Sequence, residues 1–324
     1  MVNVRSILDA HKRIHPFIRH TPLVRSPYLS RTSGAEVWLK LENWQPTGSF
    51  KVRGALNKIA LLTEEEKARG IVTGSAGNHG LGVAYAAQSM GVAQATIFVP
   101  GGAPRAKTDK MAQFGVAVHR VGATYEEAHQ MAEQYARGTG ATYISAYDDP
   151  DVVAGQGTMA LEILADLPQV DALLVPIGGG GMIAGVSVAA KTMLPTCRVI
   201  GVQPEASPAA LLSLRDGLAY DPYDHAPTIA DGLAGGFGRV PFEIAHELID
   251  QIVLASETAL RRSIFTLLDR HQLVVEASGA IAVAPLLTDS IDLKGKTVIC
   301  VLSGGNLDTS LLREIVNEFT VAAD

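Results

Sequence analysis

Short apolar runs alternate along the chain with longer segments in which apolar residues recur every three or four positions. The short runs are rich in Val, Ile and Leu, and most are followed directly by Gly, Pro or Ser. Runs of this kind are typical of buried strands, and the longer segments are typical of helices. The clearest strands are predicted at residues 36–41, 95–99, 116–121, 172–177, 198–202 and 297–302.

This order of elements predicts an α/β protein with mostly parallel sheets. Glycine-rich loops follow several of the strands, at the carboxyl ends where open α/β sheets bind ligands. Residues 64–147 contain a helix–strand alternation of their own. The 324 residues are enough for two domains, and the sequence shows no internal repeat or flexible linker.

Composition narrows the class of protein. Hydrophobic residues make up 47% of the chain and charged residues 19%, as in an ordinary globular enzyme. The net charge of −6 argues against a surface that binds nucleic acid. The sequence has neither the apolar core of a signal peptide nor the roughly 20 apolar residues that span a membrane. Cys197 and Cys300 are too few for a disulfide framework, so we expect buried thiols in a cytoplasmic protein.

Lys51 is the main candidate for covalent chemistry. It lies in a frame of small residues, Gly48-Ser49-Phe50-Lys51-Val52-Arg53-Gly54. A lysine amine forms a Schiff base with an aldehyde when burial or a nearby cation lowers its pKa. Taken alone, this segment favours an exposed lysine at the start of a helix over residues 52–62. The catalytic interpretation depends on three later loops, at residues 75–80, 178–181 and 303–306.

Four consecutive glycines at residues 178–181 join a predicted strand to a predicted helix that starts at Met182. Backbone N–H groups at a helix N-terminus, with no side chains in the way, make a phosphate site. A rival interpretation is a dinucleotide fingerprint, which the pattern Gly179-x-Gly181-x-x-Ala184 formally fits. That fingerprint also needs an acidic residue about 20 positions later, where this chain has Gln203. The run therefore predicts a phosphate site.

Together and in this order, the four motifs resemble the serine/threonine dehydratase and serine racemase family of fold-type II pyridoxal-phosphate enzymes. The resemblance covers nearly the whole chain. It implies a fold similar to the tryptophan synthase β subunit, with two open, mostly parallel α/β domains and the active site between them. Residues 1–63 and 148–324 would form the large domain, and residues 64–147 a small inserted domain. After the helix predicted at residues 307–319 the resemblance gives no place for a C-terminal regulatory domain, so we expect the threonine dehydratase type without that domain.

The resemblance also implies a set of site residues. Lys51 would be the catalytic residue, holding pyridoxal phosphate and carrying a proton at the substrate's α-carbon. The cofactor-binding residues would be Phe50, Lys51, Asn78, Gly178, Gly179, Gly180, Gly181, Met182, Gly232, Glu276 and Ser303. The substrate-binding residues would be Ser75, Ala76, Gly77, Asn78, His79 and Gln156.

Several of these residues have specific roles in similar enzymes. Asn78 would hydrogen-bond the cofactor's phenolic oxygen, and Ser303 would meet its pyridine nitrogen. A neutral hydroxyl makes the ring a weaker electron sink than a carboxylate does, which favours β-elimination over transamination. His79 is interpreted as a residue that positions its loop rather than as an acid or base. Glu276 fits equally well a carboxylate near a helix N-terminus.

Ala76 distinguishes two branches of the family. Racemases that resemble this chain carry a serine there, which exchanges a proton on the face opposite the lysine. Alanine has no exchangeable proton, so racemisation is disfavoured.

No divalent cation is expected. Similar enzymes that bind one carry a glutamate and an aspartate in the segment that matches residues 201–210, where this chain has Glu205 but no aspartate. One carboxylate is too few for a tight Mg²⁺ or Ca²⁺ site. A Na⁺ or K⁺ held by carbonyl groups stays open.

The expected activity is α,β-elimination from an L-β-hydroxy amino acid, with L-threonine and L-serine first, to give a 2-oxo acid and ammonia. Phenylserine and hydroxyaspartate stay open as substrates. The alternatives are a serine racemase, a β-replacement synthase similar to cysteine synthase, and a non-catalytic pyridoxal-phosphate carrier. The resemblance implies a homodimer.

Overall fold

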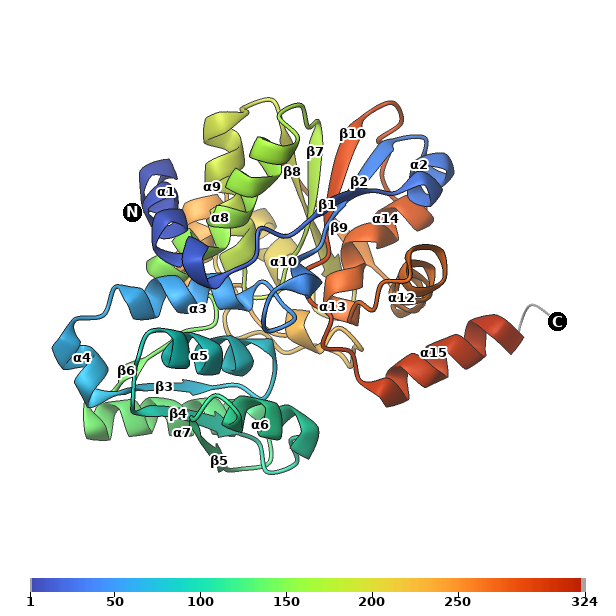
Figure 1. The fold of residues 1–324 in the computed structure, drawn as a ribbon. Coiled ribbons are helices and arrows are strands. Elements are labelled where there is room, and N and C mark those ends of the chain that lie inside the picture. The colour runs from blue at the N-terminus through green and yellow to red at the C-terminus, as the bar shows by residue number, and fades with distance from the viewer. Residues whose placement is uncertain (1, 322–324) are drawn as a thin grey trace.

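Two open sheets organise the chain within residues 2–321, the part that the computed structural model describes (Figure 1). The larger sheet has six strands in the order β1-β2-β10-β7-β8-β9, and the smaller has four in the order β5-β4-β3-β6. Strands β1 and β2 pair antiparallel, and the other pairs are parallel. The bounds are β1 Leu23–Arg25, β2 Glu36–Lys40, β3 Ile71–Gly74, β4 Ala95–Val99, β5 Ala117–Arg120, β6 Thr142–Tyr143, β7 Ala172–Pro176, β8 Arg198–Pro204, β9 Gln251–Ala255 and β10 Thr297–Val301.

The predicted parallel α/β architecture is confirmed. Each strand predicted from the sequence is present, with ends that differ by at most two residues. The pattern missed β1, β3, β6 and β9. Strands β1 and β6 have only three and two residues, which is too short for a hydrophobic period to be recognised, and β3 has only two large apolar side chains, Ile71 and Val72. Strand β9 lies at the edge of the larger sheet and is only partly buried.

Helices fill the connections between strands. Their bounds are α1 Val4–Ile14, α2 Pro27–Ser33, α3 Lys51–Ala60, α4 Glu64–Arg69, α5 Asn78–Ser89, α6 Arg105–Ala112, α7 Tyr125–Thr139, α8 Pro150–Asp166, α9 Gly181–Met193, α10 Ala209–Asp216, α11 Arg239–Ala245, α12 Glu257–His271, α13 Ala277–Ala280, α14 Ala284–Leu287 and α15 Thr309–Val321. None of those within residues 2–321 combines the length and apolar character that a bilayer crossing requires.

Both faces of the larger sheet are buried. In β7, Ala172 and Leu174 join one core cluster with α12, α13 and α14, whereas Leu173 and Val175 join another with α8 and α9. A strand that is covered on both faces has apolar residues at successive positions rather than at alternate ones. This double burial explains why the central strands were recognisable as continuous apolar runs.

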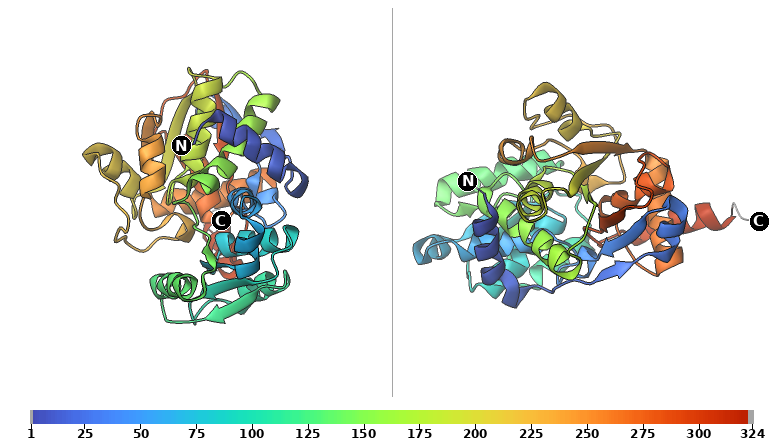
Figure 2. Two further views of the ribbon diagram at one scale, coloured as in Figure 1. Left: turned by 90° about the vertical axis from the view of Figure 1, so that its left-hand side faces the viewer. Right: turned by 90° about the horizontal axis from the view of Figure 1, so that it is seen from above.

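Helix α3 lies between the two sheets and packs with both parts of the molecule (Figure 1). Val52, Ala55 and Leu56 of α3 join the core beside α5 and the smaller sheet. On its other side α3 crosses α8, where Gly155 packs directly on the backbone of Arg53. The views in Figure 2 show the teal and green smaller sheet as a separate layer, and α15 projecting from the body. The strands of the smaller sheet all lie inside residues 64–147; the edges of a domain there stay a prediction.

Candidate active site

The loop that carries Lys51 is joined to the loop that carries Ser303. The Phe50 N–H donates to the Ser303 carbonyl at 3.0 Å, and the Gly305 N–H donates to the Gly48 carbonyl at 2.9 Å. These bonds hold the start of α3 against the chain that leaves β10. Two candidate residues that are about 250 positions apart in the sequence are thereby brought to one place.

Lys51 occupies the first position of α3, and its side chain is partly buried. The Nζ atom donates to the Ala146 carbonyl at 3.0 Å and lies 5.2 Å from the centre of the Phe50 ring. Burial lowers the pKa of the Lys51 amine to about 8, although the Glu276 carboxylate opposes the shift. A lysine with this pKa has far more of the neutral, nucleophilic amine near pH 7 than an exposed lysine does.

The loop at residues 75–80 ends β3 and starts α5. The helix begins at Asn78, and its N-cap is Gly77. No side chain caps the helix at Gly77. The Ser75 hydroxyl accepts from the Gly77 N–H at 3.3 Å.

His79 is buried and its Nε2 atom lies 2.9 Å from the Ile144 carbonyl. Burial lowers the pKa of the His79 ring to about 3, and the nearby Lys51 charge adds to the shift. The ring is therefore neutral and donates this hydrogen bond. It ties the start of α5 to the segment after β6, an arrangement that fits a positioning role better than proton transfer.

Asn78 contacts Glu276, which comes from the other part of the molecule. The Asn78 Nδ2 atom donates to Glu276 Oε1 at 2.5 Å. Burial raises the pKa of the Glu276 carboxyl to about 7, and the Asp231 charge adds to the rise. The carboxyl lies directly over Gly304, where a Cβ atom would collide with Glu276 Oε1. The small residue of the last glycine loop therefore makes room for the Asn78–Glu276 pair.

The glycine run at residues 178–181 forms the turn from β7 to α9, with Gly180 as the N-cap at φ 91°. Among the described residues, none of the N–H groups of residues 178–182 donates to a backbone carbonyl. Free N–H groups at the start of a thirteen-residue helix are a ready phosphate site.

The packing of these glycines adds a second reason for their presence. Cβ atoms at Gly179 and Gly181 would meet Tyr147, whose ring also lies against Gly238. The Tyr147 hydroxyl donates to Asp221 at 3.1 Å. The glycine count alone is therefore weaker evidence for a phosphate than the sequence suggested, because a tyrosine also requires the small residues. The free N–H groups carry that interpretation.

Ser278 connects two further candidates. The Ser303 hydroxyl donates to the Ser278 carbonyl at 3.2 Å, and the Gly232 N–H donates to the Ser278 hydroxyl at 3.0 Å. Gly178 in turn lies against the Gly232 backbone. These contacts connect the glycine run at residues 178–181, Gly232 and Ser303 to one another through Ser278. Nothing in the sequence distinguished Ser278 from an ordinary small residue.

None of these contacts includes Gln156. It is 1% exposed, on α8, with its amide against Gly54 of α3. Ala76 is partly buried and packs on the core of the smaller sheet. Met182 is buried in the first turn of α9. Within residues 2–321 no three His, Cys, Asp or Glu side chains gather as metal ligands do.

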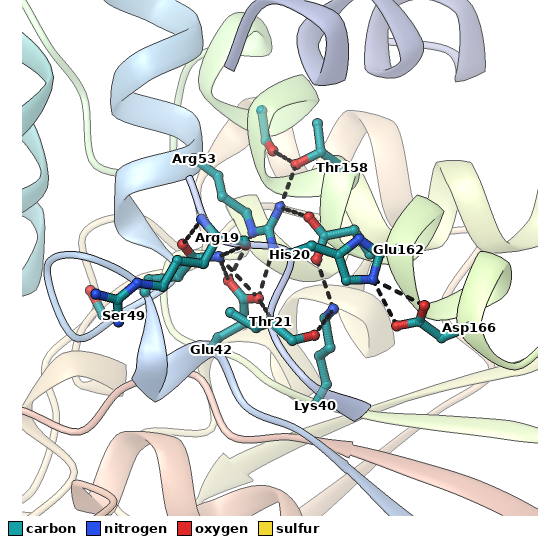
Figure 3. A network of polar contacts seen from close by, with 12 residues as sticks. Arg19, His20, Thr21, Lys40, Glu42, Ser49, Arg53, Thr158, Glu162 and Asp166 are labelled. Atoms are coloured by element: carbon teal, nitrogen blue, oxygen red, sulfur yellow. Dashed lines mark hydrogen bonds and ion pairs between the residues drawn. The ribbon is translucent and has the colours of Figure 1, made fainter. Parts of the chain in front are cut away.

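A buried charge network surrounds the Arg53 guanidinium, and the sequence gave no sign of it (Figure 3). The five N–H donors of Arg53 are all used, by Glu42, Glu162 and the Thr158 hydroxyl, at 2.7 to 3.1 Å. Lys40 donates to Glu162 at 2.7 Å. Two cations and two carboxylates balance one another, and all four side chains are at most 1% exposed. The network anchors α3 two residues after Lys51.

The donors that surround Lys51 fit pyridoxal phosphate. The amine of lowered pKa suits its aldehyde, the free N–H groups of residues 178–182 suit its phosphate, and the Ser303 hydroxyl suits its pyridine nitrogen. Asn78 offers an amide to the phenolic oxygen. These groups belong to loops that the contacts above connect to one another.

Comparison with known proteins agrees with this geometry. A family model described as pyridoxal-phosphate dependent enzyme matches residues 14–304. The chain is 44% identical over 319 residues to an L-threonine ammonia-lyase of Thermotoga maritima, covering 98% of this chain and 79% of the relative. It is 39% identical over 317 residues to the catabolic L-threonine dehydratase TdcB of Escherichia coli K12, covering 97% and 96%. A serine racemase structure from Dictyostelium discoideum superposes with a TM-score of 0.89 at 34% identity, covering 95% and 99%. This chain belongs to the family of pyridoxal-phosphate-dependent enzymes.

Proposed function

We propose that this protein is an ammonia-lyase that removes water and then ammonia from an L-β-hydroxy amino acid, with L-threonine and L-serine as first substrates. The observation that carries the proposal is the partly buried Lys51 amine of lowered pKa, which lies beside the Asn78–Glu276 pair at the junction of the two sheets. The names of the relatives at 39% and 44% identity support the same reaction.

Pyridoxal phosphate, when bound, supplies an aldehyde for the amine and a ring that accepts electrons from the substrate's α-carbon. Lys51 would hold the aldehyde and, once the substrate has displaced it, remove the proton from the α-carbon. The lowered pKa suits this task, because a base must be neutral to accept the proton. The β-hydroxyl would then leave with the electrons of its C–O bond and take up one proton to become water, which balances the proton that Lys51 removed. The released enamine would become an imine, and addition of water to the imine gives a 2-oxo acid and ammonia.

The remaining residues bind and orient. The N–H groups of residues 178–182 would hold the phosphate, with Phe50 and Gly232 beside the ring. Ser303 would donate to the pyridine nitrogen in place of the Ser278 carbonyl to which it now donates, and a neutral hydroxyl there limits how strongly the ring draws electrons. This favours rapid loss of the β-hydroxyl from the β-carbon over transamination, which needs a longer-lived carbanion at the α-carbon.

The loop at residues 75–79 would bind the substrate carboxylate through its N–H groups at the start of α5. His79 would hold this loop through its bond to Ile144. Ala76 provides no proton on the face opposite Lys51, so elimination is favoured over racemisation. Gln156 stays a predicted substrate contact, with a buried position against Gly54. Homodimeric assembly and a cytoplasmic location also stay predictions.

The test is release of 2-oxo acid by the purified protein loaded with pyridoxal phosphate. L-Threonine and L-serine are each compared with their D-enantiomers. We expect 2-oxobutyrate and pyruvate from the L-forms and little from the D-forms. Yellow protein that forms no product from either would contradict the choice of substrate, and phenylserine and hydroxyaspartate are then tested next. Formation of D-serine at a rate similar to elimination would instead support the racemase.

A further inference from the structure

The Asn78 carboxamide is held from both sides by residues of the C-terminal part of the chain. Its Nδ2 atom donates to Glu276 Oε1 at 2.5 Å, and its Oδ1 atom accepts from Asn306 Nδ2 at 2.7 Å. Both partners lie about 200 positions later in the sequence, outside the smaller sheet. Asn78 is therefore fixed by the other part of the molecule rather than by its own helix.

The direction of these hydrogen bonds is set at the Asn306 end by a group that only accepts. Asn306 Nδ2 also donates to the Thr47 backbone carbonyl at 3.0 Å, and a carbonyl oxygen has no hydrogen to give. The Asn306 amide must therefore present its nitrogen on this side. The same nitrogen also donates to the Asn78 carboxamide, which must therefore accept through its oxygen.

The Glu276 end is consistent with this direction. With its oxygen turned toward Asn306, Asn78 presents its nitrogen to Glu276 Oε1, which accepts the hydrogen bond. The acceptor at Thr47 therefore orders the hydrogen bonds as Thr47 ← Asn306 → Asn78 → Glu276. Rotating the Asn306 amide by half a turn would set its oxygen against the Thr47 carbonyl oxygen.

A count of hydrogens shows what this arrangement leaves free. A carboxamide has two N–H hydrogens and one carbonyl oxygen. In Asn78, Glu276 takes one hydrogen and Asn306 takes up the carbonyl oxygen. One N–H hydrogen is left over on the amide that the family resemblance places at the cofactor's phenolic oxygen.

We propose that Asn306 is a positioning residue that orients the Asn78 carboxamide so that its second N–H is available to the phenolic oxygen of pyridoxal phosphate. This inference rests on the proposed function. Asn306 acts through Asn78 and is not a catalytic residue. Its anchor on Thr47, four residues before Lys51, couples the orientation of the amide to the loop that carries the amine.

The experiment compares two variants with one matched control. Asn306→Ala removes the donor. Asn306→Asp keeps the shape but replaces the donor with acceptors, which oppose both Thr47 and the Asn78 oxygen. The control is Asp308→Asn, which breaks the neighbouring ion pair between Asp308 and Lys107, 3.2 Å apart, and leaves the amide pair intact. Melting temperatures show whether each variant is folded.

Two readouts that do not depend on turnover are measured. One is the affinity of the cofactor-free protein for pyridoxal phosphate, and the other is the pH midpoint at which the visible absorption of the bound cofactor changes. We expect Asn306→Ala to weaken the affinity about 5-fold, the scale of one hydrogen bond. The midpoint should move to higher pH, because an N–H donor stabilises the ionised phenolic oxygen. Asn306→Asp should have the larger effect, and Asp308→Asn should match the wild type.

The outcomes separate this inference from the proposed function. Wild-type protein that binds pyridoxal phosphate, together with a folded Asn306→Ala variant of unchanged affinity and midpoint, would overturn the role of Asn306 and leave the lyase assignment standing. An equal effect from Asp308→Asn would also overturn it, since general loosening of the loop would then be the cause. Wild-type protein that binds no pyridoxal phosphate would overturn both.

Discussion

Helix α3 separates two groups of buried ionisable residues that behave in opposite ways. On the side of α3 that packs on α8, Arg53 is paired with Glu42 and Glu162 (Figure 3). Burial alone would raise the pKa of Glu162, but the Arg53 and Lys40 charges outweigh it and hold that pKa at about 2. At the first position of the same helix, the pKa of Lys51 falls to about 8 because the effect of burial outweighs the charge of Glu276.

Burial is common to both groups, and the number of charged partners separates them. A buried ion whose hydrogen bonds are all satisfied stays ionised and makes its surroundings rigid. A buried group with few partners shifts toward its neutral form, which is the form that reacts in the case of an amine. Burial therefore has different results for two residues of one helix: Arg53 stays charged and paired, and Lys51 shifts toward its neutral form. The paired Arg53 holds in place the helix that carries the reactive Lys51 amine.

The largest expected effect is the loss of turnover when Lys51 is replaced, which tests whether this residue, unlike the paired Arg53, is catalytic. Lys51→Ala should lower turnover of L-threonine by at least about 10³-fold, since it removes both the group that holds the cofactor and the base. The melting temperature should change little. The matched control is Lys58→Ala, on the same helix, where Lys58 pairs with Asp149 and Asp151. Unchanged turnover in Lys51→Ala would refute the catalytic assignment, and lost turnover in Lys58→Ala would show that the helix itself had been disturbed.

The next effect concerns stability. Arg53→Met should reduce the free energy of unfolding by about 4 kcal/mol, because Glu42 and Glu162 would be left buried with too little compensating charge. Chemical denaturation measures this change. The comparison variant is Arg239→Ala, which breaks an exposed pair with Glu243 and should cost less than about 1 kcal/mol. Similar losses in the two variants would mean that the buried network does not anchor α3.

A smaller effect is expected in the pH dependence of cofactor capture. Only the neutral Lys51 amine reacts with an aldehyde, so the rate at which cofactor-free protein takes up pyridoxal phosphate should rise with pH through about 8. The Glu276 carboxylate stabilises the charged amine and so raises its pKa. Glu276→Gln removes that charge and should move the midpoint down by roughly 0.5–1 pH unit. Stopped-flow absorbance measures the rate, and a midpoint that moves upward would contradict the assigned pairing.

The smallest effect is a gain of a second activity. Ala76→Ser places a hydroxyl in the substrate loop, opposite the predicted face of Lys51. We expect conversion of L-serine to D-serine to rise about 10-fold over background, below the roughly 10²–10⁴-fold of a well-placed acid or base. Chiral chromatography measures the product, with Ala76→Gly as the control that changes size without adding a proton. No rise at all would weaken the explanation of Ala76 as the barrier to racemisation.

The inner strands of the larger sheet, β2, β10, β7 and β8, were the most predictable part of the fold. They are covered by helices on both faces, so residues such as Leu173 and Leu174 are both buried, and the chain shows an unbroken apolar run. Edge strands and strands of two to four residues lack that signal. Strand β6, with two residues, takes its place only by pairing with β3, about 70 positions earlier.

From the sequence, Lys51 was predicted near the start of a helix, and the glycine run at residues 178–181 and Ser303 were predicted at the ends of strands. Glycines and small polar residues mark such loops locally, so these predictions needed no knowledge of distant contacts. The sequence did not reveal Tyr147, which accounts for two of the glycines, nor Asn306, which holds Asn78. Each of these acts on a segment far away in the chain, so no local pattern records it.

By itself the sequence determined the parallel α/β class, the order of the main strands, the phosphate-type turn and a resemblance that named the family. These depend on the period of apolar residues and on residue types within one segment. Only the tertiary structure decided which buried charges are paired and which are left reactive. Glu162, a partner of Arg53, and Glu276, a partner of Asn78, lie about 100 and 200 positions away from them. A pKa depends on such neighbours in space, and folding alone brings them together.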